Sequence, residues 1–264
     1  MISITSPNNP KIKLARALKQ RKAREESGLF VVEGIRHTGE AFEAGAEFVS
    51  LWVAPELLKS DYAKSLVEQL EGRGVPVYTL AAEVFETLAE KDNPQGILAV
   101  LRQPLRGIDQ LQPANFPWGA ALVSPQDPGN IGTILRTLDA VGAAGLILLE
   151  QPADLYHPSA VRASMGALFW LPTATASFAE FHAWARRHGY ILYGTSTHGS
   201  LPYEQMQEYR RPAILVLGSE REGLTAEQSA ACDYLVRLPM KGHATSLNLA
   251  VAAGVMLYEM LLKG

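Results

Sequence analysis

Apolar runs and amphipathic stretches alternate along the first hundred residues, which is the pattern of an α/β domain. The chain opens with an amphipathic helical pattern that starts near Ile12, carries its lysines and arginines on the polar side and ends at Gly28. Strands are then predicted over residues 29–34, 48–53, 75–80 and 96–101, with helices over residues 35–44, 57–71 and 81–89 between them. The alternation predicts a small α/β sandwich.

A stretch with little hydrophobic periodicity follows. It contains Pro104, Gly107, Pro113 and Pro117, residues that interrupt both helices and strands. Domain boundaries fall in stretches of this composition. We therefore expect a first domain at residues 1–103, a linker at residues 104–117 and a second domain at residues 118–264.

The second domain alternates again, and its strands are apolar along nearly their whole length. They are predicted over residues 119–124, 145–149, 171–174, 190–195, 212–218 and 234–238, with helices over residues 130–141, 159–166, 178–188, 225–232 and 248–262. Such strands are buried on both faces, which indicates a mostly parallel sheet with helices on both sides. Pro172 cannot donate to a central ladder, so its strand is expected at an edge.

Composition narrows the class of protein. The chain has 264 residues, of which 47% are hydrophobic and 19% charged, so it can bury a sizeable core. Cys232 is the one cysteine, which excludes an intramolecular disulfide and fits a reducing compartment; we read it as a buried structural thiol. We expect no signal peptide, since the first residues contain no continuous apolar stretch, and the apolar run at residues 247–257 is too short to span a membrane. We expect a cytoplasmic protein with no membrane partner.

Charge is distributed unevenly along the chain, although the formal net charge is only −3. The first 24 residues hold seven basic residues and no acid, and the other 17 basic residues face all 27 acidic ones. The seven are Lys11, Lys13, Arg16, Lys19, Arg21, Lys22 and Arg24. A basic arm on an acidic body suggests a polyanionic partner, and a solvated first helix is the competing interpretation.

Three loops that follow predicted strands carry candidate chemistry, because the carboxyl ends of parallel strands meet at one edge of a sheet. In the first loop Asn130 lies near a helix cap and Arg136 lies on the helix beyond it. In the second, Gly218 would let backbone approach a ligand, and Glu220 would pair with a cation or with Arg136. In the third, Ser246 is a candidate N-cap.

Each loop has an ordinary alternative as well, namely a helix cap, a surface charge or a solvated charge run. No strand is followed by Gly-x-Gly-x-x-Gly, which argues against a dinucleotide site, and no phosphate-cradling P-loop is present. His157, His198 and His243 do not have the spacing of metal ligands, so we expect no metal site.

Taken together, the three loops resemble the motifs of the SpoU (TrmH-like) RNA ribose methyltransferases of the SPOUT superfamily. The motifs read Asn130-x-Gly132-x-x-x-Arg136, Leu217-Gly218-x-Glu220-x-x-Gly223, and Leu238-Pro239-Met240 followed by Ser246-Leu247-Asn248. Ser219, where the family often has Asn, and Ala244-Thr245 depart from the pattern. In the first domain, Ser6-Pro7-x-Asn9, the stretch from Arg21 to Gly34 and Asn93-Pro94-Gln95-Gly96 look like the family's substrate-binding domain, which itself resembles ribosomal RNA-binding proteins.

The resemblance implies 2′-O-methyl transfer from S-adenosylmethionine to a ribose of structured RNA. Ribosomal RNA is the preferred substrate, transfer RNA is the alternative, and a non-catalytic RNA-binding protein of the same fold is a third possibility. It also implies a trefoil-knotted catalytic domain that works as a homodimer. The catalytic residues would be Asn130, Arg136, Glu220, Ser246 and Asn248, and the cofactor-binding residues would be Thr195, Leu217, Gly218, Glu220, Leu238, Met240, Ser246 and Leu247.

Roles for some of these residues follow from their chemistry. The guanidinium of Arg136 stays protonated, so we expect it to grip a phosphate and to stabilise the developing alkoxide, with Glu220 holding it in place. The final helix, residues 248–262, is apolar nearly all round. We therefore expect it to form the interface of an isologous homodimer, packed on its own copy or on the helix at residues 130–141.

Overall fold

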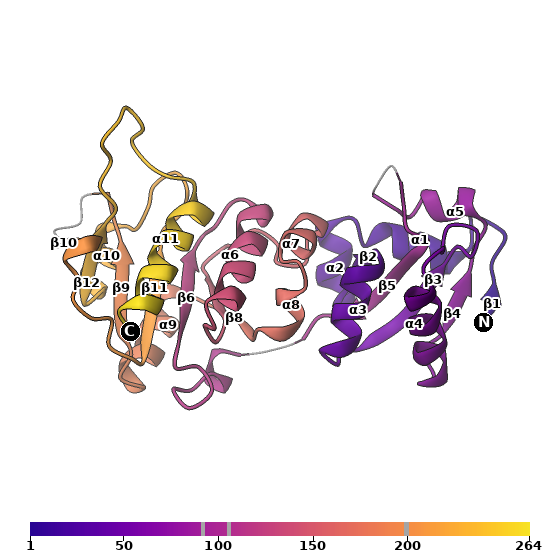
Figure 1. Cartoon of the computed structure of the whole chain (residues 1–264), viewed down its shortest axis with the longest axis horizontal. Helices are drawn as coiled ribbons and strands as arrows, with labels where there is room; N and C mark the ends of the chain where they lie inside the picture. Colours follow the sequence, from indigo (N-terminus) through magenta and orange to yellow (C-terminus); the bar gives the residue numbers. More distant parts are fainter. Residues whose placement is uncertain (91–92, 105–106, 198–200) are drawn as a thin grey trace. The chain divides into compact units, whose positions relative to one another are not determined.

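The computed structural model describes residues 1–90, 93–104, 107–197 and 201–264, and the chain forms two compact units (Figure 1). Unit 1 comprises Met1–Pro104 together with Tyr156–Arg162. Unit 2 comprises Leu105–Leu155 and Ala163–Gly264. The hydrophobic pattern gave no indication that Tyr156–Arg162, a short segment of the predicted second domain, packs in unit 1. The exact domain boundaries stay a prediction.

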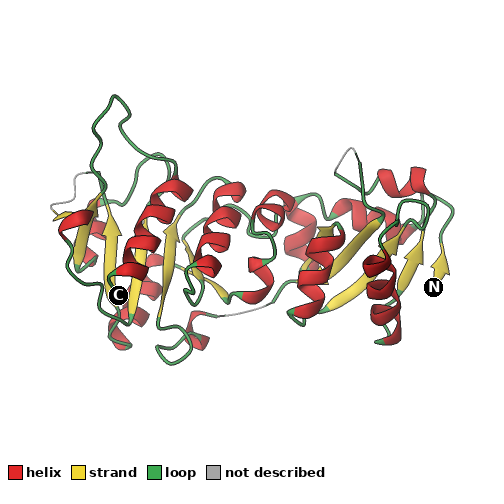
Figure 2. Ribbon diagram, in the orientation of Figure 1, coloured by secondary structure: helices red, strands yellow, loops and turns green. Residues whose placement is uncertain are grey.

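Unit 1 is built on a mixed five-stranded sheet covered by helices (Figure 2). Its strand order is β1 (Ile2–Ser3), β4 (Val77–Thr79), β3 (Phe48–Val53), β5 (Ile97–Arg102), β2 (Leu29–Glu33). The helices are α1 (Pro10–Ala17), α2 (Arg21–Ser27), α3 (Ile35–Glu43), α4 (Asp61–Gly72) and α5 (Ala82–Glu86). Strands β1, β4 and β3 run parallel, whereas β5 is antiparallel to both β3 and β2.

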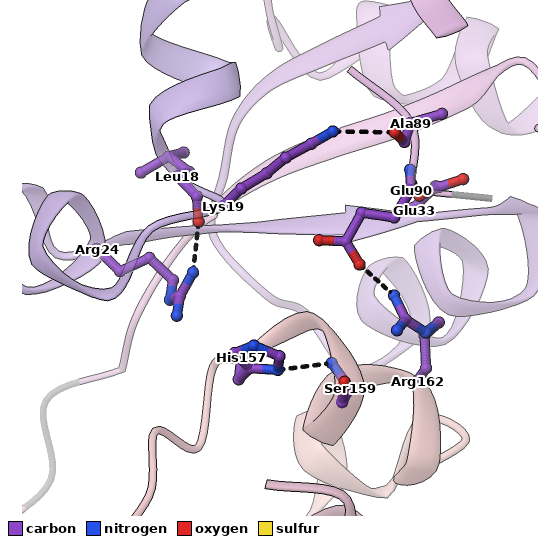
Figure 3. Close-up of polar contacts among 9 residues, drawn as sticks. All are labelled: Leu18, Lys19, Arg24, Glu33, Ala89, Glu90, His157, Ser159 and Arg162. Carbon is purple, nitrogen blue, oxygen red and sulfur yellow. Dashed lines mark hydrogen bonds and ion pairs between the residues drawn. The ribbon is translucent and has the colours of Figure 1, made fainter. Parts of the chain in front are cut away.

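The predicted basic helix is two helices, not one. Asn9 caps α1 through its side chain, and α1 ends before Leu18, which is fully buried. Helix α2 ends at Gly28, whose φ of 65° is a left-handed conformation that suits glycine. Arg24 faces the interior with 1% exposure and donates from Nη1 to the carbonyl of Leu18 at 2.6 Å (Figure 3). This arginine is therefore part of the core of unit 1 and not of a basic surface.

The segment Tyr156–Arg162, which includes most of α7 (Pro158–Ala163), completes unit 1. Arg162 donates from Nη1 to Oε2 of Glu90 at 2.6 Å (Figure 3). The ring of Tyr156 lies 4.7 Å from that of Phe30. His157 accepts from the backbone N–H of Ser159 at 3.1 Å. These contacts lie within unit 1. They explain why the segment packs there, although the residues before and after it belong to unit 2.

Unit 2 contains a fully parallel seven-stranded sheet, as the apolar strands predicted. Its order is β10 (Leu201–Pro202), β12 (Tyr234–Arg237), β9 (Ile191–Thr195), β11 (Ala213–Leu217), β6 (Trp118–Val123), β7 (Leu146–Leu149), β8 (Thr173–Ala176). Every residue of β6 and β11 is buried. The strand that follows Pro172 lies at an edge, which confirms that prediction. Strand β10 was not predicted from the sequence.

Helices cover both faces of this sheet (Figure 1). Ile214 and Val216 of β11 pack in one core cluster with α9 (Phe178–Arg187), so the alternate residues of β11 face the opposite side. There α6 (Pro128–Ala140) lies against α11 (Leu249–Leu262), and α11 contacts β11. The other helical segments of the unit are α8 (Ala167–Trp170), α10 (Ala226–Ala231) and the short 3-10 turns η1 (Ile108–Gln110) and η2 (Tyr203–Gln205).

The helix predicted at residues 159–166 is shorter in the structure. It ends at Ala163, and α8 begins at Ala167. Met165 and Gly166 between them have φ values of 53° and 106°, which no α-helix accommodates.

Among the described helices, none has both the length and the apolar character needed to cross a membrane. The knot implied by the family resemblance stays a prediction.

Candidate active site

The three loops meet at the carboxyl edge of the unit 2 sheet. Strands β6, β11 and β12 all run in the same direction, with β11 pairing directly with β6 and with β9. The loops that follow them therefore emerge on the same side of the sheet, as parallel strands require. The sequence prediction of a shared edge is confirmed.

Glu220 joins the second loop to the first. Its Oε2 accepts from the backbone N–H of Gln126 at 2.9 Å, and its Oε1 accepts from the backbone N–H of Asp127 at 3.3 Å and from Nδ2 of Asn130 at 3.0 Å. Burial would raise the pKa of Glu220, but these hydrogen bonds outweigh burial and keep the pKa below its usual value. The carboxylate is therefore ionised near neutral pH and is committed to positioning the first loop.

Asn130 continues the connection to the third loop. Its Oδ1 accepts from Nδ2 of Asn248 at 3.0 Å, and Oδ1 of Asn248 in turn accepts from the backbone N–H groups of Ala250 and Val251. Asn130 is only 8% exposed. Since each amide donates on one side and accepts on the other, the orientation of both side chains is fixed. The row Glu220–Asn130–Asn248 links all three loops.

The N-caps of α6 and α11 are both identified in the structure. Asp127 is the N-cap of α6, with Oδ1 accepting from the N–H of Gly129 at 2.8 Å, so Asn130 lies inside the first turn. Asn248 is the N-cap of α11, whereas Ser246 lies two residues earlier in an exposed part of the loop. The prediction that Asn130 lies near a cap is confirmed. The prediction of Ser246 as N-cap is wrong, because Asn248 also satisfies the capping preference and spacing alone did not separate the two residues.

Arg136 does not join this arrangement within one chain. It is exposed on α6 and makes no hydrogen bond or ion pair with any residue of the described chain. Six residues separate it from Asn130, a rotation of about 240° around a helix, so the two side chains leave different faces. Within one chain Glu220 does not hold Arg136, because both carboxylate oxygens of Glu220 bind groups of the first loop.

A cavity of about 440 Å³ opens beside the three loops. Every residue predicted to bind the cofactor lines it: Thr195, Leu217, Gly218, Glu220, Leu238, Met240, Ser246 and Leu247. Asn130, Arg136 and Asn248 are not among its lining residues. The wall also includes Ser196 and Thr197, which the sequence analysis missed. The signal was available, since both directly follow Thr195 at the carboxyl end of β9.

Gly218 is crowded by the protein's own backbone, a constraint that the sequence did not reveal. A Cβ at this position would lie 2.0 Å from the carbonyl carbon of Gly223 and 2.2 Å from the backbone nitrogen of Leu224. The second loop therefore folds back onto Gly218, with the N–H of Gly223 donating to the carbonyl of Ser219 at 3.0 Å. The glycine makes room for the protein's own turn, which in turn shapes the cavity wall.

The remaining candidate groups have structural roles or lie away from the cavity. Burial, assisted by the charge of Asp233, raises the pKa of the Cys232 thiol to about 12, and Sγ donates to the carbonyl of Gln228 at 3.4 Å. Cys232 is partly buried, so the expected full burial is not seen, and its hydrogen bond and raised pKa fit a structural thiol. His243 is exposed in the third loop, and His198 lies outside the described residues.

Comparison with known proteins agrees with this geometry. The SpoU rRNA Methylase family matches residues 119–258, and the MRM3-like substrate binding domain matches residues 9–99. The 23S rRNA (uridine(2479)-2′-O)-methyltransferase of Streptomyces viridochromogenes is 34% identical over 92% of this chain and 85% of its own. The 23S rRNA (guanosine(2553)-2′-O)-methyltransferase RlmP of Bacillus subtilis is 28% identical over 98% and 99%. The crystal structure of an AdoMet-bound rRNA methyltransferase from Sinorhizobium meliloti superposes with a TM-score of 0.89 at 34% identity, covering 98% of this chain and 96% of that one.

Proposed function

This chain belongs to the SpoU rRNA methylase family, and on that premise we propose that it transfers a methyl group from S-adenosylmethionine to a ribose 2′-hydroxyl of ribosomal RNA. The observation that carries the proposal is the row Glu220–Asn130–Asn248, which holds three loops around one cavity. Ribosomal RNA is favoured over transfer RNA because two relatives that align over most of both chains are named for 23S rRNA.

The cavity suits S-adenosylmethionine in size and chemistry. Its volume of about 440 Å³ falls within the range of small-molecule sites. Leu217, Leu238 and Met240 offer apolar surface for the adenine ring, and the hydroxyls of Thr195 and Ser246 offer hydrogen bonds to the polar end. When bound there, S-adenosylmethionine supplies an electrophilic methyl group.

Glu220, Asn130 and Asn248 act as positioning residues in this proposal. A carboxylate whose pKa lies below its usual value is a poor general base near neutral pH, and the oxygens of Glu220 are already occupied. Glu220 and Asn130 keep the first two loops in register, and Asn248 fixes the start of α11. Ser246, which is exposed beside the cavity, remains available to orient the ribose.

Arg136 is the proposed catalytic residue that contacts the RNA. Its guanidinium stays protonated, so it binds the phosphate next to the target ribose and stabilises the alkoxide that develops as the 2′-hydroxyl loses its proton to that phosphate or to water. Because Arg136 does not line the cavity of its own chain, we propose that it serves the cavity of a partner subunit.

A homodimer would supply that partner. One face of α11 and of the loop before it exposes apolar side chains at helical spacing, namely Leu247, Val251, Val255, Tyr258 and Leu262. Ala250 and Ala253 of the same helix are buried within unit 2 and so do not belong to this exposed face. We propose that the exposed stripe forms the interface, since a contiguous apolar patch of this kind marks a protein contact.

Unit 1 would bind the RNA. Lys13 and Lys22 are exposed and would contact phosphates, Lys22 in exchange for its ion pair with Glu26 at 3.8 Å, whereas Arg24 is buried. The cytoplasmic location expected from the sequence stays a prediction.

Transfer of labelled methyl groups to unmodified 23S rRNA transcript tests the proposal. We expect incorporation at a single ribose, seen as one site that resists alkaline cleavage. Incorporation into transfer RNA alone would replace the proposed substrate, and methylation of bases in place of riboses would overturn the reaction.

A further inference from the structure

Unit 1 contains a second cavity, of about 410 Å³, to which no role has yet been assigned. It is lined by Ile35, Arg36, Glu40, Glu43, Tyr62 and Gln95. The first four belong to α3, Tyr62 belongs to α4 and Gln95 lies just before β5. All six residues are within unit 1.

Tyr62 forms an aromatic wall of the cavity, and its ring packs against α3 at Gly39. Its side chain is 52% exposed, although it is a large ring on a helix. A Cβ at Gly39, in the middle of α3, would lie 2.4 Å from Oη of Tyr62. Glycine is a poor helix former, so its presence here is explained by the room that it gives to the tyrosine. The ring therefore lies close against α3 and leaves exposed surface toward the cavity.

Gln95 presents hydrogen-bond donors in a fixed orientation. Its Oε1 accepts from the backbone N–H of Ile35 at 3.0 Å. This bond directs the NH₂ group of the same amide away from α3, and within the described chain no acceptor binds it. The guanidinium of Arg36 likewise has no hydrogen bond or ion pair to a described residue, so two sets of donors are available beside the ring.

Glu40 and Glu43 supply acceptors and a negative charge. Burial raises the pKa of Tyr62, and the charges of Glu43 and Glu40 raise it further, so the phenol stays protonated at neutral pH. Two carboxylates disfavour a phosphate in the cavity. They favour instead a neutral ring that carries amino groups, because a carboxylate accepts from the exocyclic amine of a base.

Resting on the function proposed above, we propose that this cavity holds one unstacked nucleobase of the RNA substrate. The base stacks on Tyr62, its amino group donates to Glu40 or Glu43, and its acceptor atoms bind Arg36 and Gln95. Single-stranded RNA is recognised by such combinations of aromatic stacking and edge contacts. The amino group selects adenine, guanine or cytosine over uracil.

Substitution of the aromatic wall tests the inference directly. The affinity of unmodified 23S rRNA transcript for the full chain is measured by filter binding without S-adenosylmethionine. We expect Tyr62→Ala to weaken binding about tenfold, since loss of stacking on one base has this size. Tyr62→Phe keeps the ring and should bind the transcript nearly as well as the wild-type protein does. Melting temperature and S-adenosylmethionine affinity should be unchanged in both variants.

A second pair of variants separates base contacts from general charge. Arg36→Ala and Lys64→Ala each remove one positive charge, and Lys64 lies on the exposed side of α4 beside Asp61. Arg36→Ala should weaken RNA binding well beyond Lys64→Ala. Ultraviolet crosslinking followed by peptide mapping should attach RNA to the peptide that contains Tyr62.

The two proposals fail in different ways. If the unmodified protein binds rRNA but transfers no methyl group, the proposed function is wrong and the base site is still tested by affinity. If Tyr62→Ala binds rRNA as tightly as the unmodified protein, the base site is overturned, whatever the methyl-transfer result. Equal losses in Arg36→Ala and Lys64→Ala would also count against it.

Discussion

Nδ2 of Asn248 donates to Oδ1 of Asn130 across 3.0 Å, joining residues that are 118 positions apart in the chain. The contact links the start of α11 to the first turn of α6, and Asn130 extends it to Glu220. The cavity thus depends on a row of polar groups in which no member can be rotated without breaking a bond on the other side.

Asn130→Asp tests that row with a side chain of the same size. The new carboxylate would face that of Glu220, at the position where Nδ2 now donates at 3.0 Å. Repulsion replaces a hydrogen bond to a charged group, which is worth about 1.5–3 kcal/mol. We expect lower stability and at least tenfold weaker S-adenosylmethionine binding by calorimetry, partly restored near pH 5. Unchanged affinity at pH 7 would show that the row does not shape the cavity.

Arg136→Ala should abolish methyl transfer in single-turnover assays while S-adenosylmethionine affinity stays within about twofold, because Arg136 contacts the RNA and is not among the residues that line the cofactor cavity. Arg136→Lys should also be poor, since an ammonium cannot grip a phosphate with two parallel bonds. Near-normal turnover of either variant would remove Arg136 from the mechanism.

Mixed dimers can show whose cavity Arg136 serves. Met240→Glu places a charge in the cavity wall and should prevent cofactor binding. A mixture of Arg136→Ala and Met240→Glu chains, each inactive alone, should recover activity, because a mixed dimer has one intact cavity and one intact arginine from the other chain. Absence of recovery under conditions where light scattering shows mixed dimers would place Arg136 in its own subunit's site.

Gly218→Ala should disrupt the second loop, since the added Cβ meets backbone at 2.0 Å and 2.2 Å with no flexible side chain to move aside. We expect a lower melting temperature and loss of S-adenosylmethionine binding. Gly242→Ala is the matched control in the third loop, because a Cβ there meets nothing within 4 Å. A Gly218→Ala protein that binds cofactor normally would contradict the packing described.

Glu220 makes the stability of unit 2 depend on pH. Its pKa in the folded protein is lowered, so the stabilisation is complete above its usual value of 4.5 and is lost as pH falls through the folded value. Glu220→Gln should therefore be less stable than the unmodified protein at pH 7, with the difference shrinking below pH 4.5. Chemical unfolding at a series of pH values measures this. A stability difference between the two proteins that grows on acidification would show that the pKa of Glu220 is raised in the folded protein, not lowered.

The basic N-terminus should divide into RNA-binding and structural residues. Lys13→Ala and Lys22→Ala should weaken RNA binding and flatten its salt dependence, because fewer counterions are released. Arg24→Ala should instead lower the free energy of unfolding by about 1–3 kcal/mol, because the carbonyl of Leu18 loses its buried donor. If the salt dependence of RNA affinity changed in Arg24→Ala and not in Lys22→Ala, this division would be refuted.

Much of the fold follows from periodicity. The strand Phe48–Val53 was predicted at its full length, and the parallel sheet of unit 2 follows from strands that are apolar on both faces. The order of strands was not predictable, since β11 lies between β6 and β9 through contacts far apart in sequence. The break between α1 and α2 was also missed, because a helical pattern of apolar residues continues through Leu18.

The candidate site was predicted in composition and not in geometry. Every residue that the motif resemblance assigned to cofactor binding lines the cavity. The resemblance did not reveal that Glu220 binds Asn130, because a carboxylate in a loop has many acceptable partners and only the folded chain selects one. Nor did it show that Gly218 is crowded by its own turn, since a glycine looks the same in sequence whatever occupies the space.

The heptapeptide Tyr156–Arg162 restricts how this protein can be recombined. The chain crosses between its units three times, after Pro104, Leu155 and Arg162, so a chimaera spliced at one junction would be incomplete. A foreign first unit would meet Tyr156 and Arg162 without the matching Phe30 and Glu90. Exchange of RNA specificity between relatives therefore requires that this heptapeptide travel with the first hundred residues, as a discontinuous module.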